Sequence, residues 1–345
     1  MKILVVRFRQ MGDAILATCI FNTIKRNDSE AETTFILNER LAPLFNDHPA
    51  IDHIVTFSES ENHTFWRYLK KVWTVVHQTH YDVIIDMRST LKSMFFSIFS
   101  PSTIYRIGLR KWYTHGAFNY LFDRSRDNES AIDHDLMLLS PLNYTDLDQS
   151  FLLSATNKEK KDFRDYMIRM NIDFSKPVVL MGVTSKLQNK TWSVEGMVYI
   201  VRNLIQTYPQ VQIIFNYAPG VEESDSRRIY KLLNNDPHIF INIRASSPRQ
   251  LLAMSSWITF YFGNEGGARH IVHSQNKPSF VVMAPQNSKR MWLPQNGIPA
   301  EGISVEDIAS KRELDKTPLN RQYEFIKKEM VWEKFLKFID KYHIL

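Results

Sequence analysis

The feature that most constrains the fold is an alternation of short apolar runs with helical patterns, which begins at residue 3 and restarts near residue 178. Short β-type runs that alternate with helices are typical of βαβ units around a parallel sheet. In the first half we expect strands at Ile3–Phe8, Thr33–Leu37, His53–Phe57, Asp82–Met87 and Tyr105–Leu109, and helices at 14–26, 64–78 and 90–99.

The second half repeats this organisation. We expect strands at Val178–Gly182, Val211–Tyr217, Ile239–Ile243, Trp257–Gly263 and Ser279–Met283, helices at Val194–Thr207 and Glu222–Asn234, and a loop over 285–304. The chain has 345 residues, enough for two ordinary domains. The pattern predicts two consecutive Rossmann-like α/β domains, 1–173 and 174–320. Two such domains that face each other enclose a cleft, where ligands commonly bind.

The last segment, 321–345, is amphipathic, with apolar residues at helical spacing and several lysines. We expect a helix that packs on the protein. Its lysines would also suit a membrane surface, which is the alternative.

The amino-acid composition limits the classes of partner and the compartment that we expect for this protein. The net charge of +6 favours acidic ones, such as a nucleotide, an anionic lipid or a phosphorylated glycan. No signature of a nucleic-acid-binding module is present, so no nucleic acid is expected. The single cysteine, Cys19, cannot form an intrachain disulfide, which favours the cytoplasm. Arg7 and Arg9 interrupt the first apolar run, unlike a signal peptide, and no run of about 18 apolar residues exists to span a membrane.

The first candidate site lies at a strand-to-helix turn in the second half. Gly266 and Gly267 separate a predicted strand from a helical pattern, with Glu265 before them and His270 after them. Glycines allow a ligand to approach the backbone, and a helix start favours phosphate. The turn therefore suits a nucleotide, with Glu265 near a ribose. A plain tight turn is the alternative.

The second candidate site follows the first strand, where Gly12 and Asp13 precede a helical pattern. In open parallel sheets ligands bind at this carboxyl edge. Asp13 therefore either faces a ligand or acts as a helix N-cap, and the two roles are compatible.

Taken in order, short motifs across the chain resemble glycosyltransferase family 9, the lipopolysaccharide heptosyltransferases. The matching segments are Arg7 with Met11–Asp13, Tyr81–Ser93, Tyr105–Gly108, Lys190–Trp192, Asn264–Gly267 with His270, Lys277–Pro278, and Trp292 with Pro294. The chain departs from the family where Glu265 replaces an aspartate and Gly266 replaces a serine or threonine. Arg269, beside the histidine, is also an unusually large and charged residue for this position in the family.

The resemblance implies a GT-B fold and an inverting transfer from a nucleotide sugar, with no metal and no cofactor. It suggests ADP-heptose as the donor and Kdo–lipid A, or an extended inner core, as the acceptor. It also implies an enzyme in the cytoplasm that works at the inner face of the cytoplasmic membrane. A nucleotide-sugar epimerase on the same fold, another nucleotide sugar, and a non-catalytic binder are the alternatives.

The resemblance and the local chemistry together predict roles for individual residues. Asp13 is the candidate base for the acceptor hydroxyl. The donor would contact the loop and helix residues Thr184, Ser185, Lys190, Glu222, Glu265, Gly266, Gly267 and His270. The acidic acceptor would meet Gly12, Arg88, Lys92, Arg106 and Arg110, because cationic side chains bind carboxylates and phosphates. Since Gly266 carries no side chain, we expect it to leave room for the longer Glu265.

Overall fold

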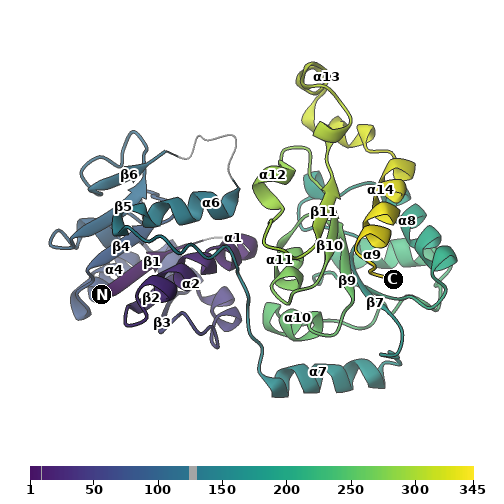
Figure 1. Ribbon diagram of the computed structural model, residues 1–345, viewed down its shortest axis with the longest axis horizontal. Coiled ribbons are helices and arrows are strands. Elements are labelled where there is room, and N and C mark those ends of the chain that lie inside the picture. The colour runs from purple at the N-terminus through teal and green to yellow at the C-terminus, as the bar shows by residue number, and fades with distance from the viewer. Residues whose placement is uncertain (9, 124–129) are drawn as a thin grey trace. The chain divides into compact units, whose positions relative to one another are not determined.

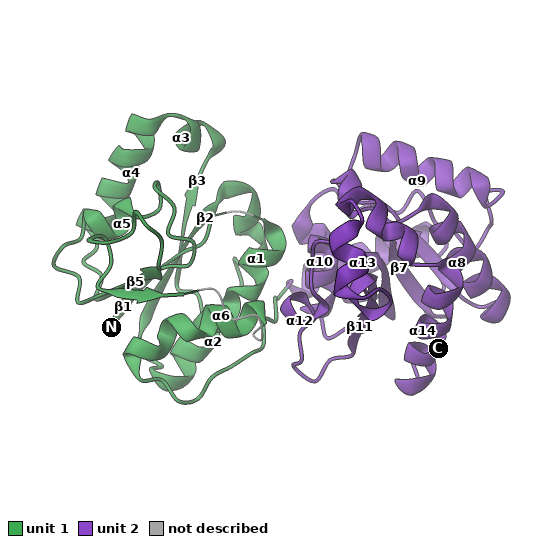
Figure 2. Ribbon diagram, turned by 90° about the horizontal axis from the view of Figure 1, so that it is seen from above, with its two compact units in different colours: residues 1–154 green, residues 155–345 purple. Residues whose placement is uncertain are grey.

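The computed structural model describes residues 1–8, 10–123 and 130–345. The chain divides into two compact units, Met1–Ser154 (unit 1) and Ala155–Leu345 (unit 2), coloured separately in Figure 2. Each unit is built around its own parallel sheet. Part of the polar stretch that follows Asp123 lies outside the described residues.

The division falls before the boundary expected at residue 173, because helix α7 (Asn157–Arg169) packs within unit 2. The guanidinium of Arg249, on α10 (Pro248–Ser255), donates to both carboxylate oxygens of Glu159 at 2.8 and 2.7 Å. Trp257 Nε1 donates to the carbonyl of Lys160 at 2.8 Å. These contacts attach α7 to the second sheet's helices.

The sheet of unit 1 has the strand order β3-β2-β1-β4-β5-β6, and all neighbouring pairs are parallel. The five predicted strands are confirmed to within two residues. The sixth strand was not predicted, since it has only three residues. The bounds are β1 Lys2–Val6, β2 Glu32–Asn38, β3 His53–Phe57, β4 Val83–Asp86, β5 Tyr105–Leu109 and β6 Tyr120–Phe122.

Helices cover both faces of this sheet. In Figure 2, α4 and α5 lie on one side of it and α2 and α6 on the other. Leu4 and Val6 share a buried cluster with Tyr68 and Val72 of α4, as the two-residue period of a strand requires. The bounds are α1 Met11–Leu16, α2 Thr18–Asn27, α3 Glu59–His63, α4 Phe65–Gln78, α5 Phe95–Ile98 and α6 Ala131–Leu136, with 3₁₀ turns at Glu39–Leu44 and Met137–Leu142.

Two helix predictions for unit 1 differ from the structure, one because the helix is divided and one because it is shorter. The helix expected at 14–26 is divided at Ala17 into α1 and α2. The helix expected at 90–99 is regular only in α5. Hydroxyl groups in the preceding turn hydrogen-bond locally, with Ser93 Oγ accepting from the amide of Thr90 at 2.9 Å. Such bonds compete with helical ones.

Unit 2 contains five parallel strands in the order β11-β10-β9-β7-β8. The strand predicted at Ile239–Ile243 was wrong, since this buried segment forms only an isolated bridge to Ile213. The predicted loop over 285–304 was also partly wrong, because it contains α12 (Lys289–Trp292) and β11 (Ala300–Ile303). The bounds are β7 Val178–Gly182, β8 Gln212–Phe215, β9 Phe260–Asn264, β10 Ser279–Val282 and β11 Ala300–Ile303.

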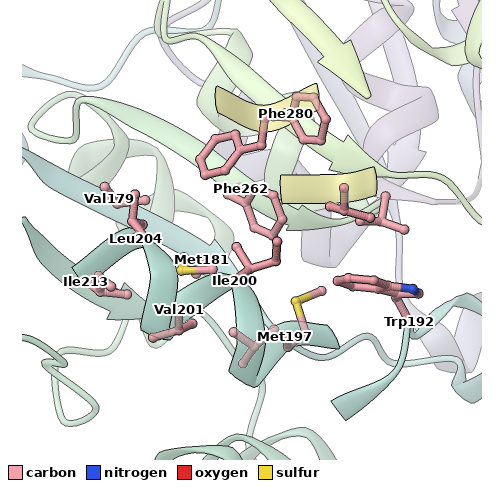
Figure 3. Close-up of a cluster of buried hydrophobic side chains, with 14 of the residues drawn as sticks. Val179, Met181, Trp192, Met197, Ile200, Val201, Leu204, Ile213, Phe262 and Phe280 are labelled. Atoms are coloured by element: carbon pink, nitrogen blue, oxygen red, sulfur yellow. The ribbon is translucent and has the colours of Figure 1, made fainter. Parts of the chain in front are cut away.

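The main core of unit 2 lies between its sheet and helices α8 and α14. Figure 3 shows Phe262 and Phe280 of the sheet in one cluster with Ile200 of α8. Phe335 of α14 lies 4.6 Å from the ring of Phe262, so the amphipathic C-terminal helix is part of this core. Figure 1 places α8, α9 and α14 on one side of the sheet and α10 and α11 on the other. The bounds are α8 Val194–Thr207, α9 Val221–Leu232, α11 Gly267–His273, α12 Lys289–Trp292, α13 Lys311–Lys316 and α14 Lys328–Lys341, with 3₁₀ turns at Gln188–Lys190, Val305–Asp307 and Leu319–Phe325.

Candidate active site

The carboxyl ends of β7 and β9 are tied together by Asn264, the last residue of β9. Its Nδ2 donates to the carbonyl of Gly182 at 3.1 Å, and its Oδ1 accepts from the amide of Trp192 at 2.7 Å. Trp192 is buried, and its Nε1 donates to the carbonyl of Ile326 at 3.1 Å. Asn264 therefore fixes the loop that carries Lys190, and Trp192 packs in the core of unit 2.

Glu265 lies at the centre of the unit 2 site. Its carboxylate is buried and accepts from Asn287 Nδ2 at 2.7 and 2.6 Å. Lys190 Nζ lies 3.3 Å from Oε1 of the same carboxylate. The structure thus brings together two predicted donor residues that are 75 positions apart in the chain. Asn287, in the loop after β10, was missed, since nothing in its local sequence marks it.

The explanation given for Gly266 was wrong. A Cβ at this position would meet nothing within 4 Å, so its absence is not what makes room for Glu265. The φ of 174° is also extended backbone that any residue can adopt. The glycine that the backbone requires near this turn is Gly263, with a φ of +154°, because a Cβ there would lie 2.5 Å from the carbonyl oxygen of Gly182.

His270 lies inside α11, fully buried beside Arg269. Arg269 Nη2 donates to the carbonyl of Trp292 at 2.7 Å and lies 3.0 Å from His270 Nε2. Burial, with the charge of Arg269, holds the pKa of His270 well below its usual value. Burial also lowers the pKa of Arg269 to about 10, so at neutral pH a charged guanidinium lies against a neutral imidazole.

The remaining predicted donor residues lie around this centre. Thr184 is buried after β7, and its Oγ1 lies 3.4 Å from Ser226 Oγ. Ser185 is half-buried in the same loop. Glu222 is the second residue of α9, where its Oε2 accepts from the amide of Ala218 at 3.4 Å. A carboxylate in the first turn of a helix is favourable by itself, so Glu222 has a structural role without a ligand.

In unit 1, the predicted base Asp13 forms an ion pair with Arg7. Arg7 Nη2 lies 3.0 Å from Asp13 Oδ1, and Arg7 Nη1 donates to the carbonyl of Met87 at 3.1 Å. The arginine side chain is 3% exposed and that of Asp13 is 22% exposed. Asp13 is the third residue of α1, and Gln10 is the N-cap, so the N-cap alternative for Asp13 was wrong. Gly12 is buried in the same helix.

The loop after β4 is held by a second aspartate, Asp86. Its Oδ1 accepts from the amides of Arg88 and Ser89 at 3.1 and 2.8 Å. Burial raises the pKa of this carboxyl group. Lys111 Nζ donates to the carbonyls of Arg88 and Ser89 at 2.6 and 3.1 Å. These bonds place the backbone of Arg88 at the same sheet edge as Asp13.

The other predicted acceptor cations are more dispersed. Lys92 Nζ donates to the carbonyl of Asn62 at 2.6 Å. Arg106 lies within β5 opposite Ile84, two residues before the strand reaches the level of Asp86. Arg110 Nε lies 3.2 Å from Asp123, so part of its charge is already paired. Within the described ranges, no group of three potential metal ligands gathers to hold an ion.

Each unit therefore presents polar residues at the carboxyl edge of a doubly wound sheet, the usual ligand site of such folds. The whole chain resembles the crystal structure of a glycosyl transferase family 9 protein from Veillonella parvula. The TM-score is 0.84 at 14% identity, with 99% of this chain and 97% of that one covered. A structure of the E. coli heptosyltransferase WaaC with ADP gives a TM-score of 0.66 at 13% identity, with 94% and 99% covered. The protein has the GT-B fold of these glycosyltransferases.

The family follows from the sequence comparison. The model of glycosyltransferase family 9 (heptosyltransferase) matches residues 69–320, and the chain belongs to this family. It is also 20% identical over 328 residues to the lipopolysaccharide heptosyltransferase 1 of Campylobacter coli, with 92% of this chain and 93% of the relative covered. The protein is thus a glycosyltransferase.

Proposed function

We propose that the protein transfers heptose from ADP-heptose to the inner core of a lipopolysaccharide or lipooligosaccharide, with inversion at the anomeric carbon. The support is the family, whose description names heptosyltransferases, and the C. coli relative, named for lipopolysaccharide. The solved relative in complex with ADP supports an adenine nucleotide as the donor. The acceptor would be Kdo–lipid A or an already extended core.

The proposed mechanism rests on the hydrogen bonding and exposure of the Asp13 carboxylate. Arg7 binds Oδ1, whereas Oδ2 accepts no hydrogen bond from any described residue, and the side chain is partly exposed. Oδ2 would take the proton from the acceptor hydroxyl as that oxygen attacks the anomeric carbon. The bond from this carbon to the diphosphate oxygen breaks, and its electron pair leaves with ADP. General-base help of this kind is typically worth about 10²–10⁴-fold.

On the donor side, Lys190 would stabilise the charge that develops on the diphosphate. Its ammonium group has three N–H donors, and the half-buried ion pair with Glu265 occupies one of them. Thr184 and Ser185 would add hydroxyl donors from the preceding loop. Glu265 would accept from a ribose hydroxyl, since Asn287 and Lys190 already hold its carboxylate in place. Such preorganised charge would take the place of a divalent metal ion.

The acidic acceptor would contact the cations near the unit 1 site: Arg88, Lys92, Arg106 and Arg110. A nucleotide-sugar epimerase would need no such acceptor contacts. Family membership favours the transferase over that alternative.

The test is Asp13→Asn, which removes the acidity and keeps the shape. We expect a loss of transfer of at least about 10²-fold. Calorimetric affinity for ADP-heptose should be unchanged, since Asp13 acts on the acceptor. Asp28→Asn is the matched control, because Asp28 has a similar exposure of 28% but lies just before β2, at the amino edge of the sheet. Near-normal turnover by purified Asp13→Asn protein would remove Asp13 as the base.

The donor itself is tested by a thermal-shift panel of ADP, UDP and GDP with their sugars. A ligand at 100 times its dissociation constant stabilises the folded state by about 2.7 kcal/mol. A shift with a uridine or guanosine donor and none with ADP-heptose would overturn the donor assignment.

A further inference from the structure

Unit 1 exposes a continuous set of aromatic side chains on α4 and α5. Trp66 and Trp73 are 76% and 52% exposed. They share one face of α4 with Lys70, since positions 66, 70 and 73 have helical spacing. We call the following residues the aromatic face: Phe65, Trp66, Trp73, Phe95, Ile98 and Phe99.

Ring contacts connect this face across the two helices. Phe65 lies 5.6 Å from Trp66 and 6.1 Å from Phe95. Phe99 lies 5.3 Å from Trp73 and 5.4 Å from Phe95. Figure 2 likewise shows α4 and α5 side by side on one side of the sheet. The half-buried rings of Phe95 and Phe99 therefore connect the exposed rings of Phe65, Trp66 and Trp73 into one surface.

The core of unit 1 requires only part of this face to be apolar. Phe95 and Phe99 are half-buried and pack against the core cluster, whereas the exposed Trp66 and Trp73 are not part of it. Helix α4 already buries Tyr68, Val72 and Val76 against the sheet, on its opposite side. Large exposed apolar patches are uncommon on folded proteins and mark interaction surfaces. Something in the environment of the protein is therefore expected to cover this face.

The charge around the aromatic face indicates what covers it. Residues 59–123 contain eight lysines and arginines and five acidic residues, of which Glu61 pairs with Lys71 and Asp123 pairs with Arg110. Asp86 is buried, and Asp82 accepts a hydrogen bond from the amide of Lys2 at 2.8 Å. Arg67 and Lys70 are exposed on α4 and form no ion pair with any described residue. The surface that fits is an anionic one.

We propose that the aromatic face docks unit 1 on an anionic phospholipid bilayer. Trp66 and Trp73 would enter the headgroup region, where tryptophan is enriched, and Arg67 and Lys70 would meet lipid phosphates. A second copy of the chain fits less well, since symmetric pairing would bring the same cations together. The aromatic face also adjoins an acceptor candidate, because Lys92 lies in the turn three residues before Phe95.

This docking goes beyond the proposed transfer reaction and is tested without turnover. Flotation of the full-length protein would be compared on vesicles of phosphatidylethanolamine with 30% phosphatidylglycerol and on pure phosphatidylcholine. We expect binding to the anionic vesicles that weakens as salt rises. Trp66→Ser with Trp73→Ser should reduce this binding at least tenfold, and Arg67→Gln with Lys70→Gln should reduce both the binding and its salt dependence.

Trp112→Ser is the matched control, since Trp112 is 88% exposed in unit 1 but outside the aromatic face. Loss of binding with this variant alone, or no binding of wild type to anionic vesicles, would overturn the proposal. A wild-type dimer that the Trp66/Trp73 variant dissociates, without vesicle binding, would assign the face to self-association instead. Unchanged melting temperatures and ADP affinities identify folded variants, so a failure of docking is separate from a failure of the proposed function.

Discussion

Lys190 Nζ lies 3.3 Å from Oε1 of Glu265, so the lysine expected at the diphosphate and the glutamate expected at the ribose form one ion pair. The carboxylate is buried and the lysine is half-buried. Removing either residue therefore leaves the other without its charge partner. Effects on nucleotide binding have to be separated from effects on folding.

Lys190→Ala should weaken binding of ADP about tenfold at low salt, because a charge-assisted contact to phosphate is lost. The difference from wild type should shrink as salt rises. Calorimetry measures both. Lys186→Ala is the control, since Lys186 is exposed on the same loop. Equal effects of the two substitutions would mean that only general surface charge is involved.

Glu265→Asp should also weaken nucleotide binding, because the shorter side chain cannot reach Asn287, Lys190 and a ribose together. Since a Cβ at Gly266 meets open space, Gly266→Ser should leave the fold unchanged and restore a hydroxyl donor. A double-mutant cycle on ADP affinity measures any coupling between the positions. An unaffected ADP affinity in Glu265→Asp would show that Glu265 only supports the loop.

The two glycines near this turn should respond in opposite ways to alanine. Gly263→Ala forces a Cβ to 2.5 Å from the Gly182 carbonyl at a φ of +154°, and we expect a loss of at least about 2 kcal/mol in the free energy of unfolding. Gly266→Ala should change it by less than about 0.5 kcal/mol. Urea denaturation of both variants measures these changes in the free energy of unfolding. Equal stability of the two would contradict the close approach of β7 and β9.

Mild acid should destabilise the protein through two buried histidines. Burial lowers the pKa of His48 and His273 to about 4, whereas an unfolded histidine takes a proton near 6.5. Below pH 6.5 the unfolded chain therefore binds more protons, and the free energy of unfolding falls until about pH 4. Each histidine accounts for about 2 kcal/mol at pH 5. His48→Gln should reduce the fall in the free energy of unfolding between pH 7 and 5. His63→Gln is the exposed control and should not change it.

Transfer activity should persist in excess EDTA, since Lys190 and the loop hydroxyls are proposed to stabilise the leaving diphosphate. The measurement is the rate of ADP release before and after chelation. Loss of activity that magnesium or manganese restores would overturn this part of the mechanism.

Periodicity was sufficient to predict most of the fold. The apolar runs at β1, β2 and β7 have no other plausible structure, and Asp13 and Glu265 could be located because each follows such a run. The run 239–243 is equally apolar, yet burial alone does not decide whether a segment pairs as a strand. β11 was missed because Ala300–Ile303 has little strand character of its own.

Contacts between distant segments could not be predicted. The Lys190–Glu265 pair and the bond from Asn287 join three different loops, and no spacing in the sequence encodes them. Arg7 was visible as a charge at the end of an apolar run. Its partner was not, because Asp13 reaches it only after α1 has formed.

The C-terminal helix limits how far the chain can be shortened without exposing its core. The family match ends at residue 320, but Phe335 and Phe338 of α14 pack on Phe280 in the sheet, and the carbonyl of Ile326 holds Trp192 beside the lysine loop. A truncation at residue 320 would expose this core and release the loop that carries Lys190. A fragment that consists of unit 2 alone should therefore begin before α7 and retain everything through α14.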